Sequence, residues 1–133
     1  MRIKRKKMTD ERIEITLGDG KIYLNEDNIM CIDVVGDLPH DLAIPLKEGV
    51  LKLMDRVPGK VDVLTDLNKA GKPSAKVREV GRQLAGNSKM GKIALFGIHP
   101  VARMIAFFWM SKFTRQDMRF FKTKEEALAW IEE

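Results

Sequence analysis

The chain has 133 residues, of which 44% are hydrophobic and 32% are charged, and its formal net charge is +5. This length and apolar content suit one ordinary domain with a single core. No stretch approaches the roughly 20 apolar residues needed to cross a bilayer, and the N-terminus lacks the apolar segment of a secretory signal. We therefore expect a cytoplasmic protein, with its single cysteine, Cys31, buried as a small hydrophobic residue.

The excess positive charge is concentrated near the N-terminus. Five basic residues between positions 2 and 7 account for the whole net charge, and 19 basic and 19 acidic residues remain from position 8 onward. We predict a flexible basic arm over residues 1–8 and a single domain over residues 9–133. Such an arm is typically a solvated tail, so we expect no specific recognition of nucleic acid.

The first half of the chain predicts a hairpin followed by a strand and a helix. Alternating apolar residues around a glycine-containing turn indicate a β-hairpin over residues 12–26. The apolar run at residues 29–35 is typical of a strand buried on both faces. The helix that follows ends near Asp55 and has Pro45 in its first turn. Its predicted apolar face consists of Leu46, Val50, Leu53 and Met54.

Three further strand–helix units follow. A strand at residues 61–67 leads to a helix that opens at Ser74, with an apolar stripe of Val77, Val80, Gly81 and Leu84. A strand at residues 92–96 leads to the segment "HPVARMIAFFWMSKF". A strand at residues 118–121 leads to a helix that begins with a capping box, Thr123 and Glu126. We predict an α/β fold: an N-terminal β-hairpin, then four βα units in a mainly parallel sheet, with the hairpin at one edge.

The loops that follow the parallel strands are the predicted binding rim, because ligands collect beyond the carboxyl ends of such strands. The rim residues are Asp37, His40, Asp66, Asn68, Lys72, Ser74, His99 and Lys122. His40, His99 and Asp66 suit acid/base or metal chemistry, but their spacing is not diagnostic. We therefore predict no catalytic site, metal or cofactor, and a small enzyme that uses the loop histidines stays an alternative.

The segment between Lys69 and Lys92 is strongly basic, since its seven Lys and Arg residues face only Glu79. If the apolar stripe of the helix that opens at Ser74 faces the core, the basic residues of that helix project into water. This surface is either a solvated face or a contact for an acidic protein surface or acidic lipid headgroups.

The segment "HPVARMIAFFWMSKF", residues 99–113, is apolar on nearly all sides of a helix. One face suits the sheet and comprises Val101, Met104, Ile105 and Phe108. A second apolar face comprises Ala102, Ala106, Trp109 and Phe113. One sheet cannot cover both, so a neighbouring helix, a second subunit, an apolar ligand or a lipid surface must bury the rest. The predicted interface residues are Arg103, Phe107, Trp109, Met110 and Phe113.

Three stretches, "VDVLTDLNKAG", "HPVARMIAFFWMSKF" and "MRFFKTKEEALAWIEE", resemble a little-characterised, STAS-like branch of the STAS, or SpoIIAA-like, superfamily. The founding members of that superfamily are bacterial anti-sigma-factor antagonists. The resemblance implies a βα superhelical fold related to that of lipid-exchange domains, and a role in binding or regulation.

The resemblance also implies a role for Ser74. STAS-type antagonists place a phosphorylatable serine at the start of the helix after this strand, and Ser74 occupies a similar position. The usual Asp-Ser-Ser-Gly pattern is absent here. A phosphate at Ser74 would be stabilised by the helix N-terminus and by Lys72 and Lys76, and the alternative is a plain N-cap serine.

Taken together, the sequence predicts a cytoplasmic, non-catalytic STAS-like binding or regulatory domain that forms a homodimer and acts through protein contacts. The first alternative is a module that binds an apolar ligand or a lipid. It is favoured by the surplus of aromatic and methionine residues near Arg103 and Lys112.

Overall fold

The computed structural model describes residues 13–112 and 117–133, apart from the side chains of residues 106 and 108–112. The predicted basic arm lies outside these ranges.

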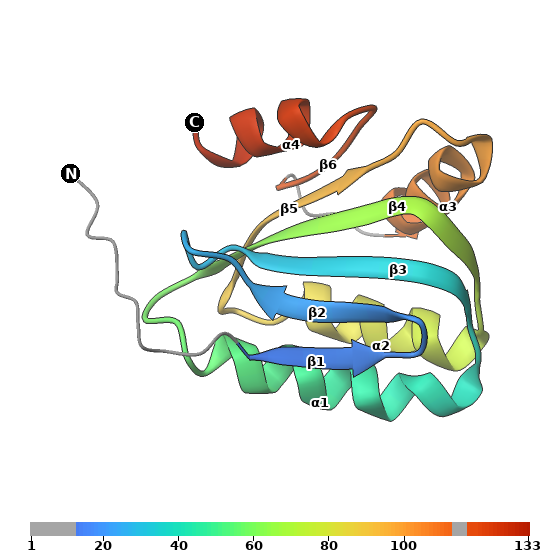
Figure 1. Cartoon of the computed structure of the whole chain (residues 1–133), viewed down its shortest axis with the longest axis horizontal. Coiled ribbons are helices and arrows are strands. Elements are labelled where there is room, and N and C mark those ends of the chain that lie inside the picture. The colour runs from blue at the N-terminus through green and yellow to red at the C-terminus, as the bar shows by residue number, and fades with distance from the viewer. Residues whose placement is uncertain (1–12, 113–116) are drawn as a thin grey trace.

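The described strands form a six-stranded sheet in the order β1-β2-β3-β4-β5-β6 (Figure 1). The strands are β1 (Glu14–Leu17), β2 (Gly20–Leu24), β3 (Met30–Leu38), β4 (Val61–Pro73), β5 (Met90–Phe96) and β6 (Met118–Phe121). The helices are η2 (His40–Leu42), α1 (Ala43–Met54), α2 (Ala75–Ala85), α3 (Pro100–Lys112) and α4 (Lys124–Ile131).

The sheet begins with the predicted hairpin at its edge. Leu17 pairs with Gly20 across the turn between β1 and β2, and Gly18 has a φ of 61°, which glycine adopts without a steric penalty. β2 and β3 are antiparallel, whereas the pairs β3–β4, β4–β5 and β5–β6 are parallel. The predicted α/β fold, a hairpin followed by four βα units, is therefore confirmed.

The larger core lies between one face of the sheet and the helices α1, α2 and α3. Pro45 lies in the first turn of α1, and the apolar face predicted for this helix is buried. The Ser74 hydroxyl caps α2 by accepting a hydrogen bond from Val77 N at 3.2 Å. Val77, Val80 and Leu84 are buried beneath this helix, as the predicted stripe requires, whereas Gly81 is half-buried.

The other face of the sheet is covered by α4, above the sheet in Figure 1. The Thr123 hydroxyl accepts a hydrogen bond from Glu126 N at 3.2 Å, which confirms the threonine half of the predicted capping box. The second bond differs, because Glu126 Oε1 accepts from Lys122 N at 3.3 Å and not from the N-cap residue. Trp130 packs on the face of the sheet, not at its edge, with Cys31 among its buried neighbours. The prediction of a buried Cys31 is confirmed.

β4 is longer than the sequence predicts. Residues 66–73 have the composition of a loop, yet they continue the strand and pair with β3 as far as Leu38 and Pro73. Proline is tolerated there because it ends the strand, where a ladder N–H is not required. The prediction that this strand ends at residue 67 and is followed by a rim loop is therefore wrong, since the strand continues to Pro73.

The face that α3 presents to the sheet also differs from the prediction. Ala102 is fully buried and Ile105 packs against the larger core, whereas Met104, assigned to the sheet face, is 70% exposed. The sequence predicts Ala102 on the second apolar face of this helix, which something other than the sheet was expected to bury. In the described ranges no helix is long and apolar enough to cross a membrane.

Candidate functional site

The carboxyl ends of the parallel strands form two steps instead of one rim. β4 pairs with β5 only as far as Asp66 and Phe96, but with β3 as far as Leu38 and Pro73. β4 therefore extends beyond β5. Apart from Lys122, the predicted rim residues divide between an inner step at the end of β5 and an outer step at the ends of β3 and β4.

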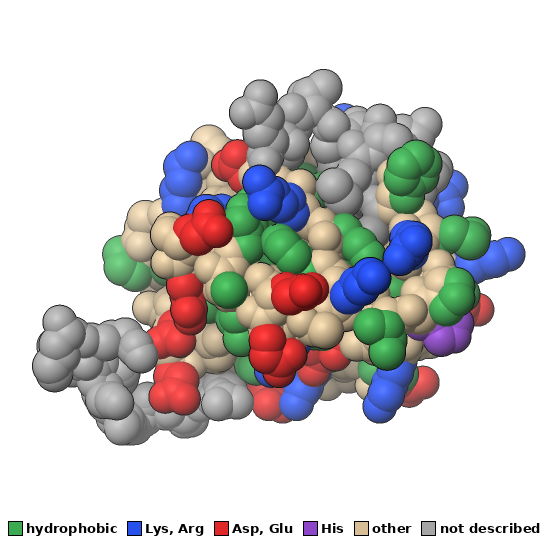
Figure 2. All heavy atoms as spheres, turned by 90° about the horizontal axis from the view of Figure 1, so that it is seen from above, with side chains coloured by type: hydrophobic (Ala, Val, Ile, Leu, Met, Phe, Trp, Pro, Cys, Tyr) green, Lys and Arg blue, Asp and Glu red, His purple; other side chains and the backbone are tan. Residues whose placement is uncertain are grey.

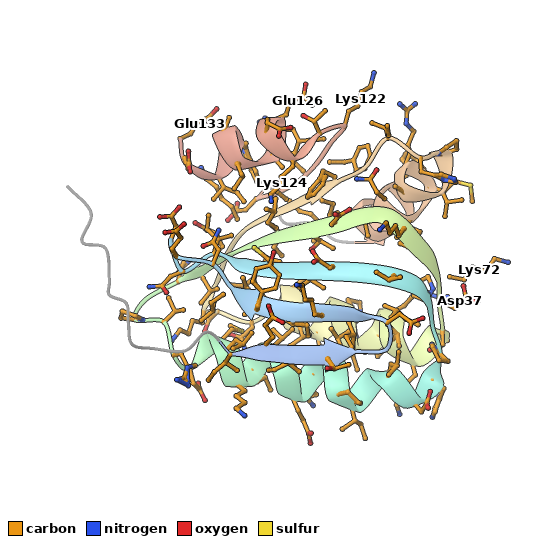
Figure 3. The ribbon with its side chains drawn as sticks, in the orientation of Figure 1. Asp37, Lys72, Lys122, Lys124, Glu126 and Glu133 are labelled. Carbon is orange, nitrogen blue, oxygen red and sulfur yellow. The ribbon has the colours of Figure 1, made fainter. Side chains whose placement is uncertain are left out.

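The outer step brings together Asp37, Lys72 and Ser74. Asp37 Oδ1 accepts a hydrogen bond from Lys72 N at 2.8 Å, and Leu38 O accepts one from Ser74 N at 2.8 Å. In Figure 3, Asp37 and Lys72 lie next to each other, and the Lys72 side chain extends away from the sheet. His40 follows in η2 and is exposed. The polar groups of the outer step hold the ends of β3 and β4 together, and the ammonium group of Lys72 stays in solvent.

The inner step is organised by Asn68. Asp66 Oδ1 accepts hydrogen bonds from the backbone N and the side-chain amide of Asn68, at 2.9 and 3.2 Å. The side-chain oxygen of Asn68 accepts a hydrogen bond from Ile98 N at 3.0 Å. Asp66 and Asn68 therefore fix the loop that leads into α3. His99 immediately precedes that helix, and its Nδ1 accepts a hydrogen bond from Val101 N at 3.2 Å.

The remaining rim residue, Lys122, lies apart from Asp37 and Lys72 at the start of α4 (Figure 3). The two histidines also lie on different steps, because His40 follows β3 and His99 follows β5. Within residues 13–112 and 117–133, no three His, Cys, Asp or Glu side chains group so as to hold a metal ion.

In the basic segment between Lys69 and Lys92, some Lys and Arg side chains have partners within the protein and others are exposed to solvent. Arg82 forms an ion pair with Glu79, and Arg78 donates a hydrogen bond to Pro73 O at 2.9 Å. Lys92 lies under α4, where its Nζ donates to Trp130 O at 2.8 Å and lies 5.3 Å from the centroid of the Trp130 ring. Lys69, Lys72 and Lys76 remain exposed around the start of α2.

An exposed apolar surface follows the inner step along the chain. Ile98, Met104 and Phe107 are 75%, 70% and 74% exposed, and all three belong to the β5–α3 loop or to α3. Arg103 is exposed beside them. Figure 2 shows hydrophobic side chains interspersed with Lys and Arg at the right-hand end of the molecule, the end that carries α3 in Figure 1. Of the predicted interface residues, Trp109, Met110 and Phe113 lie outside the described side chains.

A carboxylate pair that the sequence reasoning missed lies on the α4 face of the sheet. Asp33 of β3 and Asp66 of β4 are partners in the parallel register. Burial raises the pKa of Asp33, and the negative charge of Asp66 raises it further, while Lys21 and Lys124 act in the opposite direction. Figure 3 shows Lys124 pointing from α4 toward the sheet. The sequence contains one signal of this pair, because each aspartate interrupts an apolar run that forms a strand.

The raised pKa of Asp33 predicts a pH-dependent gain in stability for Asp33→Asn. Because the folded state holds this proton more tightly than the unfolded state, the native protein loses stability as pH rises above the ordinary aspartate pKa of about 3.9. The asparagine variant removes that loss. The side chain is only half-buried, so we expect a gain of a few tenths of a kcal/mol at pH 7 and none at pH 3.

Urea unfolding of the wild-type chain and of Asp33→Asn between pH 3 and pH 7 measures this difference. Glu26→Gln, at an exposed carboxyl in the turn before β3, is the matched control. A difference between Asp33→Asn and the wild-type chain that stays constant over this pH range would contradict the prediction.

Comparison with known proteins places the fold. A protein from the DUF3478 family of Shewanella loihica PV-4, described as uncharacterized and as having a SpoIIAA-like fold, superposes with a TM-score of 0.64 at 16% identity. This match covers 94% of the present chain and 98% of the other. The anti-sigma factor antagonist SpoIIAA in its unphosphorylated form superposes with a TM-score of 0.59 at 14% identity, covering 85% of this chain and 97% of SpoIIAA. No curated protein sequence matches the chain.

At these identities the two solved structures show the fold alone. The family comes from the sequence itself, because the SpoIIAA-like family model matches residues 29–132, from the start of β3 to the end of α4. This range includes both steps of the rim and the whole of α3. The chain therefore belongs to the SpoIIAA-like family.

Proposed function

We propose that this protein is a non-catalytic regulatory domain of the cytoplasm that acts by binding other protein chains. Its SpoIIAA-like family membership supports a role in regulation through protein contacts. The solved structure named as an anti-sigma factor antagonist has the same fold. The polar residues of the two steps hold backbone groups in place, which suits a rigid binding surface.

The observation that carries this proposal is the exposed apolar surface of Ile98, Met104 and Phe107, each at least 70% exposed. Large contiguous apolar patches are uncommon on the free surface of a soluble protein and mark interaction sites. Methionine and aromatic residues are enriched in the cores of protein interfaces, and arginine is also enriched there. Arg103, exposed on the same helix, fits the edge of such an interface.

We assign this surface to a homodimer. A twofold interface brings the same patch of both subunits together, so an apolar patch is complementary to itself. Met104 and Phe107 are three residues apart and therefore neighbours on the surface of α3. Two such helices can bury each other's apolar side chains while each Arg103 keeps its charge in water.

The test is the oligomeric state of the full chain. Phe107→Glu places a charge within the proposed interface, where a buried unpaired charge is strongly unfavourable. We expect sedimentation equilibrium to show a dimer for the wild-type chain and a monomer for Phe107→Glu at the same concentration. A loss of about 2 kcal/mol, typical of an interface hot spot, would raise the dimer dissociation constant about 30-fold.

Ile44→Glu is the matched control, because Ile44 is also a large exposed hydrophobic residue, at 62%, but lies on α1. This variant should remain a dimer. A wild-type chain that is monomeric up to about 100 μM, or a Phe107→Glu variant that dimerises as well as Ile44→Glu, would overturn the homodimer.

Phosphorylation of Ser74 stays a prediction. The position supports it, because Ser74 caps α2 and exposed Lys72 and Lys76 flank it in the sequence. A phosphate there would meet the positive end of the helix dipole as well as the two ammonium groups. The name of the solved antagonist, which specifies an unphosphorylated form, points to the same kind of regulation in that protein.

A further inference from the structure

A cavity of about 130 Å³ lies within the larger core, between the sheet and the helices α1, α2 and α3. Its walls are side chains from all three of these helices and from the central strands, among them Val50, Val77 and Ile105. Small residues contribute to the space, since Gly81 and Ala85 of α2 face it. Ile98, Arg103, Met104 and Phe107 of the proposed homodimer surface are not among its described lining residues, so ligand binding in the cavity and dimerisation can be tested separately.

The middle of the sheet shows where the packing is incomplete. Ile32, Thr65 and Leu95 form one row across β3, β4 and β5, and all three line the cavity. Ile32 and Leu95 are only half-buried, although each lies on a strand with neighbours on both sides. Well-packed cores close such positions completely. A ligand would therefore find accessible apolar surface in the centre of the domain.

Among the described residues that line the cavity, only Thr65 has a polar side chain. It is 8% exposed, and within the described part of the chain its hydroxyl makes no side-chain hydrogen bond. A buried hydroxyl without a partner is unfavourable, and valine would fill the same volume without that penalty. Water is a poor partner here, because a buried water needs two to four polar groups and the described side chains of the wall supply one.

We propose that the cavity binds a small, uncharged, largely apolar molecule with a single hydrogen-bonding group, and that the Thr65 hydroxyl pairs with that group. The size follows from the volume, because an engineered cavity of about 150 Å³ in another protein stays dry and binds benzene. A single aromatic ring or a comparably small aliphatic group fits. A charged ligand is disfavoured, because the described lining residues offer no group to compensate a buried charge.

The experiment uses two probes of nearly equal shape, phenol and toluene, which differ by a hydroxyl in place of a methyl group. Their dissociation constants are measured by NMR titration of the ¹⁵N-labelled full chain, for the wild type and for Thr65→Val. We expect saturable shifts at cavity residues such as Val63 and Val77. The ratio of the toluene to the phenol dissociation constant should fall about five-fold in Thr65→Val, the effect of one net hydrogen bond.

Two controls keep the outcome clear. Thr65→Val should melt at a temperature no lower than the wild type, which shows that the variant folds. Leu95→Phe, which fills the space from the half-buried position beside Thr65, should bind neither probe while remaining folded. The proposal is overturned if neither probe gives saturable shifts in the wild type. It is overturned equally if the toluene-to-phenol ratio is the same with and without the hydroxyl.

Discussion

Replacing Trp130 by alanine is expected to lower the free energy of unfolding by about 3–5 kcal/mol, the usual cost of removing a buried tryptophan. The side chain is 8% exposed and lies in the smaller core, on the face of the sheet that α4 covers. Its ring centroid lies 5.7 Å from that of Phe121. Because α4 has eight residues and its position depends on this packing, we expect the helix to detach at a lower denaturant concentration than the rest of the chain.

Urea unfolding followed by circular dichroism measures the loss. Trp130→Phe keeps an aromatic body and should lose less, and Ala129→Gly, at an exposed position of the same helix, should lose about 1 kcal/mol. If Trp130→Ala were no less stable than the glycine variant, the smaller core would not hold α4 in place.

Gly71→Ala should be the most damaging single-methyl change at the outer step, with an expected loss of about 2–3 kcal/mol. A Cβ at Gly71 would lie 2.2 Å from Asp37 Oδ1 and 2.8 Å from both Asp37 N and Gly36 C. The carboxylate can rotate away, but the backbone of β3 cannot move without separating the two strands. Separation would also break the hydrogen bond from Lys72 N to Asp37 Oδ1.

Thermal unfolding of Gly71→Ala measures the loss of stability, and hydrogen exchange at Ser74 N, which bonds to Leu38 O, reports on the separated strand ends. Gly86→Ala is the control, because a Cβ there would meet only ordinary contacts of 3.6 and 3.7 Å. Adding Asp37→Ala to Gly71→Ala should restore only part of the stability, since the backbone contacts remain. Full restoration by the double variant would show that the side chain alone causes the clash.

The helix starts were predictable because their signals are local. Ser74 and Thr123 each cap a helix through a bond to a backbone N–H three residues later, so a short stretch of sequence contains the whole interaction. The strand runs were predictable for a similar reason, since alternation and apolar runs are read along one segment. These features were enough to place the hairpin and four βα units in the correct order.

The staggered rim was not predictable, because it depends on partners that are distant in the sequence. Residues 66–73 contain Asn, Gly and Pro, and their strand conformation comes from pairing with β3. The orientation of α3 was missed for a different reason. A helix that is apolar on nearly all sides carries little information about which face turns inward, so Met104 was assigned to the sheet and Ala102 was not.

The order of the strands in the sheet is the same as their order along the chain. During synthesis, each strand that leaves the ribosome can therefore pair with the one already in place, and no strand has to insert between two others. The face covered by α4 is the exception, because its cover follows all six strands in the chain. Until residues 124–131 emerge, Leu64 and Ala94 stay open to water, and a nascent or C-terminally truncated chain is exposed to aggregation on that face.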